Sequence, residues 1–213
     1  MLVYIMRHGQ TDWNRLGRIQ GSSDIPLNAE GIRIAEAAAE GMRREGITFD
    51  RIYSSPYKRA HKTAEIVGGA SGVPVIDDER IREMGFGTYE GCDYERLKQT
   101  DDNIRVCFED PDRYRPAYGA ESYEDVLGRV RDFLEHEIRP LEADPDVRSV
   151  LVVCHGAVIR AFLSIIKDLP LSEFWNMSQP NCCVNVIECR NGSFEIIKER
   201  MLFYNRQSDC HNG

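Results

Sequence analysis

The chain has 213 residues, of which 42% are hydrophobic and 29% are charged. This is the composition of an ordinary globular protein, and it excludes a disordered or fibrous chain. The length fits one α/β domain, so we expect residues 1–213 to form a single domain. The formal net charge of -8 argues against nucleic acid as a partner, because a negative field repels polyanions. A chain of this charge that binds a small anion must gather its arginines in one local pocket.

The N-terminal residues and the cysteines bear on localisation. Residues 1–6 lack a basic leader and a long apolar core, and Arg7-His8 follows them at once, so they form neither a signal peptide nor a membrane span. The seven cysteines are odd in number and contain no C-x-x-C pair, which favours reduced thiols. We therefore expect a cytoplasmic protein without a membrane partner.

Potential metal ligands are scattered along the sequence. Cys182 and Cys183 are adjacent, and adjacent side chains on a strand point to opposite faces, so they do not readily share one ligand shell. None of the five histidines pairs with another at ligand spacing on one element. We expect no metal and no cofactor.

In the N-terminal half, short apolar runs alternate with segments of helical spacing. We predict strands at residues 2–6 and 73–76, and a strand running into a helix start over residues 51–56. Helices are predicted at residues 29–44 and from Pro56 to residue 67. Asn28 is a suitable N-cap for the first helix, and Pro56 suits an early position in the second. A long polar loop is expected between the first strand and the first helix.

The middle of the chain is irregular. Residues 92–118 mix aromatic, charged and proline residues without a clean period, so we expect short helices and loops there. We interpret residues 86–121 as a lid over one end of the sheet. Ser122 with Asp125 resembles a helix-starting cap, and this helix should end near Pro140.

The C-terminal part contains the strongest strand signal. Residues 149–154 form an apolar run that leads straight into a helical segment through residue 167. Residues 184–189 and 194–201 form a hairpin around an Asn-Gly turn, and the tail after Tyr204 is expected to be frayed. The hairpin either pairs across a two-fold axis in a homodimer or forms a covered edge, and the sequence leaves both open.

Strands that alternate with helices predict a three-layer αβα fold with a mostly parallel central sheet, to which the hairpin adds antiparallel strands. Ligands of such sheets lie at the carboxyl ends of the strands. Two of these ends carry the same dipeptide, because the first strand leads through Arg7 to His8-Gly9 and residues 149–154 lead to His155-Gly156. Parallel strands therefore place both imidazoles on one edge of the sheet.

Arginines are the second component of this pattern. Arg7 adjoins His8, and Arg59 lies in the first turns of the helix that follows another strand. A guanidinium matches the oxygens of a phosphate group, and a helix N-terminus adds oriented N–H groups. Either histidine alone, or Arg59 alone, would more often be structural, but the combination predicts an oxyanion pocket. His61 has no such context and is left out of the site.

Four sequence blocks resemble, in order, the signature of the histidine phosphatase superfamily, the phosphoglycerate mutase-like proteins. They are Arg7-His8-Gly9-Gln10-Thr11 with Asn14, Gln20-Gly21 and Asp24-Ile25-Pro26-Leu27; Ser54-Ser55-Pro56 with Arg59-Ala60 and Thr63-Ala64; Arg82-Glu83-Met84-Gly85-Phe86-Gly87 with Glu90-Gly91; and His155-Gly156. The resemblance covers essentially the whole chain. Gln10 stands where the family often has glutamate.

The resemblance implies roles for single residues. His8 would attack phosphorus and form a phosphohistidine, and Glu83 would protonate the leaving group and then deprotonate the attacking water. The phosphoryl oxygens would be held by Arg7, Arg59 and His155. Substrate contacts are expected from Asn14, Gln20, Gly21 and Gly156. Two arginines and a second histidine can offset the charge of phosphoryl transfer without metal, and both arginines disfavour the imidazolium form of His8.

The residues after Glu83 separate the two enzymatic branches. Mutases of this family usually have an arginine directly after this acid and a tyrosine soon afterwards, whereas this chain has Met84-Gly85-Phe86. We therefore expect a phosphatase, a phosphoric monoester hydrolase acting on a small phosphorylated metabolite. The alternatives are a phosphoglycerate mutase-type transfer and a non-catalytic regulator that binds phosphorylated ligands. The ester itself is left open, with Tyr118 and Glu121 as guesses for contacts to it.

Overall fold

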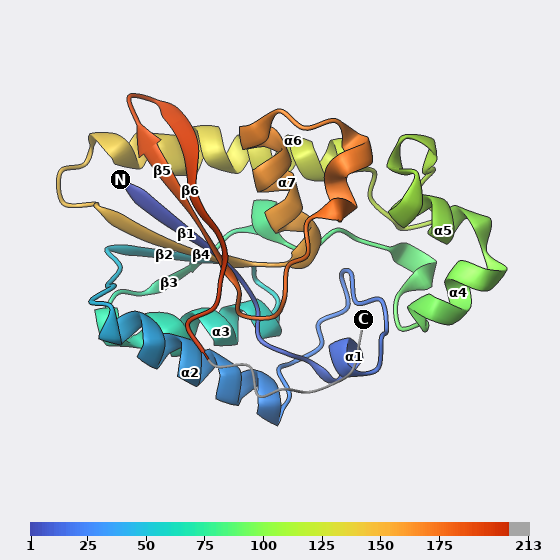
Figure 1. The fold of residues 1–213 in the computed structure, drawn as a ribbon, viewed down its shortest axis with the longest axis horizontal. Coiled ribbons are helices and arrows are strands. Elements are labelled where there is room, and N and C mark those ends of the chain that lie inside the picture. The colour runs from blue at the N-terminus through green and yellow to red at the C-terminus, as the bar shows by residue number, and fades with distance from the viewer. Residues whose placement is uncertain (205–213) are drawn as a thin grey trace.

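The computed structural model describes residues 1–204, which fold around a six-stranded sheet covered by helices on both faces (Figure 1). The strands are β1 (Leu2–Arg7), β2 (Arg51–Ser54), β3 (Val75–Asp77), β4 (Ser149–Cys154), β5 (Val184–Arg190) and β6 (Ser193–Met201). The helices are α1 (Asp12–Arg15), α2 (Ala29–Arg44), α3 (Lys58–Gly68), α4 (Tyr94–Thr100), α5 (Asp102–Glu109), α6 (Tyr123–Phe133) and α7 (Gly156–Lys167). The expected frayed tail after Tyr204 lies outside the described residues.

The strand order in the sheet is β3-β2-β4-β1-β5-β6. The first four of these strands run parallel, whereas β5 pairs antiparallel with β1 and β6 pairs antiparallel with β5. The prediction of a three-layer fold with a mostly parallel sheet is confirmed. The C-terminal hairpin is confirmed too, and its turn residues Asn191 and Gly192 both have the positive φ angles that a tight hairpin turn requires.

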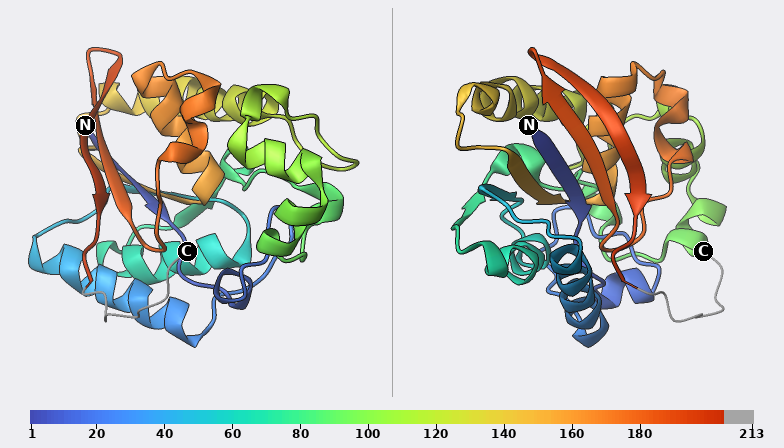
Figure 2. Two further views of the ribbon diagram at one scale, coloured as in Figure 1. Left: turned by 45° about the vertical axis from the view of Figure 1, so that its right-hand side comes forward. Right: turned by 60° about the vertical axis from the view of Figure 1, so that its left-hand side comes forward.

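Two hydrophobic clusters fill the space between the sheet and its helices. Helices α2 and α3 cover one face, α6 and α7 cover the other, and α4 and α5 lie beyond one end of the sheet (Figure 1 and Figure 2). Along β4, Val150 and Val152 belong to the cluster under α6 and α7, whereas Leu151 and Val153 belong to the cluster under α2 and α3. This burial on both faces explains why the β4 sequence is a continuous apolar run.

The pairing of β1 with β4 fixes the place of the two His-Gly dipeptides. Arg7 is in register with Cys154, and the backbone N–H of His8 donates to the carbonyl of Cys154 at 3.0 Å. His8 and His155 therefore leave neighbouring strands at the same level. The end of the sheet that carries them faces α4 and α5.

The region from 86 to 121 consists of short elements, as the sequence predicts. It contains α4, α5 and single 3-10 turns at Gly87–Tyr89 and Pro111–Arg113. Ile104 and Cys107 of this region are fully buried in the cluster under α6 and α7. Its role as a lid stays a prediction.

Several boundaries differ from the sequence-based expectations. Helix α3 begins at Lys58 with Tyr57 as its N-cap, so Pro56 precedes the helix. Strand β3 starts at Val75, because Pro74 has no N–H to donate to β2. The loop after β1 contains the unpredicted helix α1, which is opened by a capping box between Thr11 and Asn14.

The helix that was expected to reach Pro140 loses its α-helical geometry earlier. Helix α6 begins with the predicted capping box at Ser122 but ends at Phe133, and a π turn (Leu134–Ile138) and a 3-10 turn (Arg139–Ala143) follow. Pro140 lacks an N–H and crowds the carbonyl of the preceding turn, so the regular hydrogen bonds do not continue.

Cys182 and Cys183 lie just before β5 and not on it, and Cys182 has a positive φ of 54°. The expectation that these two cysteines lie on a strand is therefore wrong. Both side chains are fully buried. No group of three or more His, Cys, Asp or Glu side chains that could hold a metal ion occurs within residues 1–204. Nor does any helix in this range combine the length and apolar character needed to cross a bilayer.

Candidate active site

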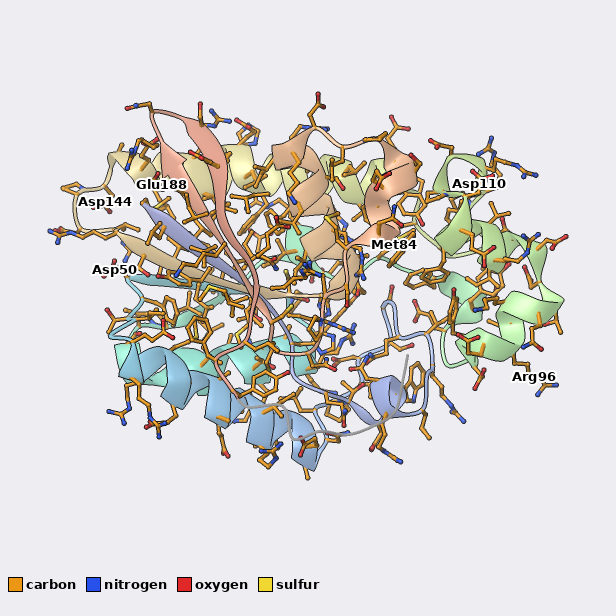
Figure 3. All side chains as sticks on the ribbon, in the orientation of Figure 1. Asp50, Met84, Arg96, Asp110, Asp144 and Glu188 are labelled. Atoms are coloured by element: carbon orange, nitrogen blue, oxygen red, sulfur yellow. The ribbon has the colours of Figure 1, made fainter. Side chains whose placement is uncertain are left out.

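A cavity of about 310 Å³ opens at the end of the sheet where β1 and β4 finish. Its walls include all the expected site residues except His155, which lies behind His8 with a ring centroid distance of 5.1 Å. The structure therefore brings the predicted residues together from β1, the loop after it, α3, the loop before α4 and α7. In the side-chain view, the cavity end lies away from Asp50, Asp144 and Glu188, which mark the opposite end of the sheet (Figure 3).

The charge of the cavity is opposite to that of the whole chain. Arg7, Arg18, Arg59 and Arg160 line it, and Glu83 is its one carboxylate. Among the described residues, none of these four arginines forms an ion pair with a carboxylate within 4.0 Å. The local concentration of positive charge that the net charge of -8 demanded is thus present here.

His8 is held in one tautomer at the end of β1. Its side chain is 1% exposed, and Nδ1 lies 2.7 Å from the carbonyl oxygen of Gly9, to which it can only donate. The lone pair is therefore on Nε2. Burial first, and then the charges of Arg59 and Arg7, hold the pKa of His8 well below its usual range. The ring is therefore neutral at neutral pH, with Nε2 unprotonated.

His155 caps the end of β4 with both ring nitrogens in use. Nε2 lies 2.7 Å from the hydroxyl of Ser55, and Nδ1 accepts a hydrogen bond from Nε of Arg59 at 3.3 Å. Burial and then the charge of Arg59 lower the pKa of His155 well below its usual range. Ser55 was part of a recognised sequence block, but its contact with this ring was not predicted.

Arg59 is fully buried and is held by the loop that follows α1. Its Nη1 donates to the carbonyl of Ser23 at 2.6 Å and its Nη2 to the carbonyl of Gly21 at 2.8 Å. The guanidinium also lies 5.0 Å from the ring centroid of Tyr57. These contacts fix the direction of the fork and leave its other N–H groups for a ligand.

Gly21 has a positive φ of 53°, and the loop around it is tied to the 86–121 region by Glu90. This carboxylate accepts from the N–H of Ser22 at 2.7 Å, from the hydroxyl of Ser23 at 2.7 Å and from the N–H of Phe86 at 3.1 Å. Gly21 was expected to approach the substrate. In the structure Gly21 also positions Arg59, because its carbonyl accepts a hydrogen bond from Nη2 of Arg59.

Arg7 reaches the cavity from the last position of β1. Its Nη1 donates to the carbonyl of Gln179 at 2.5 Å, and its buried Nε has no acceptor among residues 1–204. Gly156 leaves room beside it, since a Cβ on Gly156 would lie 3.8 Å from Arg7 Nε and 3.1 Å from Arg160 Nη1. An unpaired, buried N–H beside an open cavity is suited to an oxyanion.

Glu83 faces the cavity from the loop between β3 and α4. Its Oε1 accepts from the N–H of Met84 at 3.0 Å and from that of Ala157, in the first turn of α7, at 3.2 Å. The loop is fixed by Glu121, which accepts from the N–H of Gly85 at 2.9 Å and from Arg129 through two bonds of 3.1 Å. Glu83 is thereby placed at the N-terminus of the helix that starts after His155.

Asn14 and Gln20 line the cavity from the loop after β1. Oδ1 of Asn14 accepts from Thr11 N–H at 3.2 Å and from Asn181 at 3.3 Å, so its Nδ2 is left to donate. Oε1 of Gln20 accepts from the Thr11 hydroxyl at 2.8 Å. The two amides thus have their oxygens engaged and are oriented as donors.

The structure does not place the guessed contacts Tyr118 and Glu121 at the cavity. Tyr118 is 91% exposed, Glu121 is engaged with Arg82 and Arg129, and neither lines the cavity. The insertion instead contributes aromatic side chains to the wall, which are Phe86, Tyr94 and Phe108, joined by Trp175. Sequence reasoning also missed Arg160, although its spacing of four residues from Gly156 places it on the same face of α7.

The chain is similar to known proteins over nearly its whole length. The family model of the histidine phosphatase superfamily (branch 1) matches residues 3–200. Putative phosphoserine phosphatase 2 of Hydrogenobacter thermophilus is 30% identical over 210 residues, which cover 96% of this chain and 98% of that protein. A probable phosphoglycerate mutase of Proteus mirabilis is 34% identical over 191 residues, which cover 89% of this chain and 85% of that protein. The crystal structure of a mutant phosphoserine phosphatase from Entamoeba histolytica in complex with phosphoserine has a TM-score of 0.80 at 26% identity, covering 94% of this chain and 97% of that one.

Proposed function

Because this chain belongs to the histidine phosphatase superfamily, we propose that it hydrolyses the phosphate monoester of a small metabolite through a phosphohistidine on His8. The observation that carries the proposal is the neutral Nε2 of His8 in a cavity lined by unpaired arginines. A nucleophile needs its lone pair free, and the transferred phosphoryl group needs positive charge around its equatorial oxygens. Both conditions are met at one place.

The first step transfers the phosphoryl group to the enzyme. Nε2 of His8 forms a bond to phosphorus while the bond from phosphorus to the ester oxygen breaks. The developing positive charge on the ring is offset by the Nδ1–H bond to the Gly9 carbonyl. Arg7 and Arg59 stabilise the oxygens of the phosphoryl group from two sides, so the charge is balanced without a metal ion.

Glu83 supplies the proton that the departing oxygen needs. One of its oxygens is occupied by the N–H groups of Met84 and Ala157, which leaves the other for the leaving group. After the alcohol departs, the Glu83 carboxylate accepts a proton from water as the water attacks phosphorus. The phosphorus–nitrogen bond of His8 then breaks, and inorganic phosphate is released.

Water is the proposed acceptor because the residues directly after Glu83 lack the arginine and the tyrosine that are usual in mutases resembling this family. Met84 is fully buried and Phe86 gives the cavity an aromatic surface, whereas mutases resembling this family have an arginine and a tyrosine there. Relatives named as phosphoserine phosphatases support hydrolysis. The relative named as a probable phosphoglycerate mutase supports isomerisation as the second candidate.

The test measures inorganic phosphate released from p-nitrophenyl phosphate and from phosphoserine in the presence of a metal chelator. We expect turnover by the wild type and a loss of about a thousand-fold or more in His8→Ala, as is usual when a covalent nucleophile is removed. His136→Ala is the matched control, because this histidine has a side chain that is 71% exposed and pairs with Asp132 away from the cavity. Equal turnover by wild type and His8→Ala would sink the proposal.

Two further measurements separate the alternatives. Acid-labile, base-stable radiolabel on His8 after reaction with a labelled ester supports the covalent intermediate, whereas a non-catalytic binder retains none. Isomerisation of 3-phosphoglycerate faster than phosphate release would replace the hydrolase with a mutase.

A further inference from the structure

Arg160 is a cation in the cavity that the proposed phosphoryl transfer does not use. It lies on α7 and lines the cavity, and its Nη1 donates to the carbonyl of Gly156 at 2.8 Å. Its Nε is shut off from solvent and has no acceptor in the part of the chain that the structure describes. In residues 1–204 no carboxylate forms an ion pair with it. A cation that is partly buried without a counter-ion is costly unless a ligand supplies one.

The guanidinium of Arg160 is oriented before any ligand arrives. It lies 4.9 Å from the ring centroid of Trp175. The indole is itself fixed, because its Nε1 donates to the hydroxyl of Tyr123 at 2.6 Å and to the carbonyl of Cys107 at 2.9 Å. Preorganisation of this kind lowers the entropy cost of binding an anion.

A second cation lies close to Arg160. Nη1 of Arg160 and Nε of Arg7 are both within 4 Å of the point where a Cβ of Gly156 would be. Burial and then the charge of Arg7 lower the pKa of Arg160 to about 10, so the side chain is still protonated at neutral pH. Two adjacent cations repel, and the strain is relieved when each has its own anionic group.

The cavity has room for more than a phosphate group. Its volume is about 310 Å³, and its wall includes four aromatic side chains besides the polar and charged groups, which are Phe86, Tyr94, Phe108 and Trp175. Phe86 and Phe108 stack with centroids 5.8 Å apart, and Phe108 lies 4.5 Å from the ring centroid of Trp175. This surface suits a compact organic body placed between the phosphate and Arg160.

We propose that Arg160 binds a carboxylate on the leaving group, so that the preferred substrates are phosphate monoesters of small acids that also carry a hydroxyl group. This inference rests on the proposed function. One guanidinium matches the single charge and the planar pair of oxygens of one carboxylate. Arg160 thus serves specificity, while Arg7 and Arg59 serve the phosphoryl group.

The test compares esters that differ only in the carboxylate. O-Phosphoserine is paired with O-phosphoethanolamine, and 3-phosphoglycerate is paired with glycerol 3-phosphate. In the wild type we expect kcat/KM to favour the carboxylate-bearing member of at least one pair by about 30-fold or more, the usual cost of leaving one member of a buried charge pair alone. Arg160→Met keeps the apolar contact with Trp175 and should abolish this preference while changing kcat/KM of the other member less than about threefold.

Controls separate specificity from folding and from general activity. Arg113→Met is the matched control, because this side chain is 75% exposed and pairs with Asp110 outside the cavity. It should leave both members of each pair unchanged. Arg160→Lys keeps the positive charge and should keep part of the preference for the carboxylate-bearing ester. Its kcat/KM values test the inference if Arg160→Met unfolds at a lower temperature than the wild type.

p-Nitrophenyl phosphate has no second anion, so it separates this inference from the proposed function. If the wild type does not hydrolyse it or any other ester, the proposed function fails. If the wild type hydrolyses these esters without a carboxylate preference, or prefers a sugar bisphosphate to every carboxylate, the inference alone is overturned. An equal loss on both members of each pair in Arg160→Met would likewise refute it.

Discussion

Replacing Gly21 by alanine tests whether the loop that holds Arg59 is fixed through Glu90. Gly21 has a φ of 53°, a conformation that costs an alanine about 1 kcal/mol. An added Cβ would also lie 2.2 Å from Oε1 of Glu90, far inside any real contact distance. The carboxylate must therefore move away from the N–H groups of Ser22 and Phe86. Two hydrogen bonds to a charged acceptor are worth about 3 kcal/mol at a partly exposed site, so the total loss should be about 4 kcal/mol.

The chain offers a matched control for the backbone term. Gly46 also has a positive φ, of 71°, but a Cβ there would have no neighbour within 4 Å. Gly46→Ala should therefore cost only about 1 kcal/mol. Urea denaturation followed by circular dichroism gives the free energy of unfolding of each variant, and kcat/KM for p-nitrophenyl phosphate reports on Arg59. We expect kcat/KM to fall at least about tenfold in Gly21→Ala and to stay near the wild type in Gly46→Ala.

A double-mutant cycle isolates the contact itself. In a Glu90→Ala background the obstructing carboxylate is gone, so Gly21→Ala should cost its backbone term and whatever the 3.0 Å approach of the new Cβ to the backbone N of Phe86 adds. The two changes should be coupled by about 3 kcal/mol. Additive losses would refute the reasoning, because they would mean that the alanine is accommodated without displacing Glu90. So would a loss in Gly21→Ala no larger than that in Gly46→Ala.

Three shorter predictions concern the groups around the nucleophile. Because the pKa of His8 is held below its usual range in the folded protein, the unfolded chain binds a proton that the folded chain does not as the pH falls below about 6.5. The free energy of unfolding should therefore decrease as the pH falls. In urea denaturation between about pH 5 and 7, His8→Asn should reduce the slope of unfolding free energy against pH by up to about 1.4 kcal/mol per pH unit. An unchanged slope would contradict the burial of a neutral ring. Ser55→Ala leaves Nε2 of His155 buried without a partner, so we expect a loss of about 1–3 kcal/mol in unfolding free energy and a lower kcat, measured together. Glu121→Gln weakens the bond that holds the Gly85 N–H beside Glu83, and kcat should fall about tenfold while KM changes little; an unchanged kcat would show that this loop does not depend on Glu121.

The parts of the fold that the sequence predicts are those determined by local pattern. Residues 149–154 are buried on both faces of the sheet and therefore form a continuous apolar run. This run predicts a central strand without any knowledge of the strands that pair with it. The capping box at Ser122 and the Asn191-Gly192 turn also depend on nearby residues alone. The end of α6 was missed because helical periodicity continues past Phe133 while the hydrogen bonding changes to π and 3-10 geometry.

In the site, too, the sequence predicts what depends on local pattern and not what depends on contacts between distant segments. His8 and His155 could be placed together because parallel strands in register end at one level, and this needs only the strand assignment. The partners of Arg59 could not be predicted, since they are backbone carbonyls of Gly21 and Ser23 that a loop brings across from another part of the chain. Nothing in the composition of a loop predicts where its carbonyls point.

The groups proposed to contact phosphorus and the group proposed to select the leaving group are held in different ways. Arg59 is held by main-chain carbonyls, and His8 and Arg7 are held by carbonyls of Gly9 and Gln179, so none of these bonds requires a particular side chain as its acceptor. Arg160 has one such bond, to the carbonyl of Gly156, but its guanidinium also lies against the side chain of Trp175. Three aromatic side chains of the cavity wall, Phe86, Tyr94 and Phe108, belong to the 86–121 region. Substitutions there can therefore alter which leaving group fits while the groups that contact phosphorus keep their geometry, whereas any change to the loop of Gly21 should affect every ester alike.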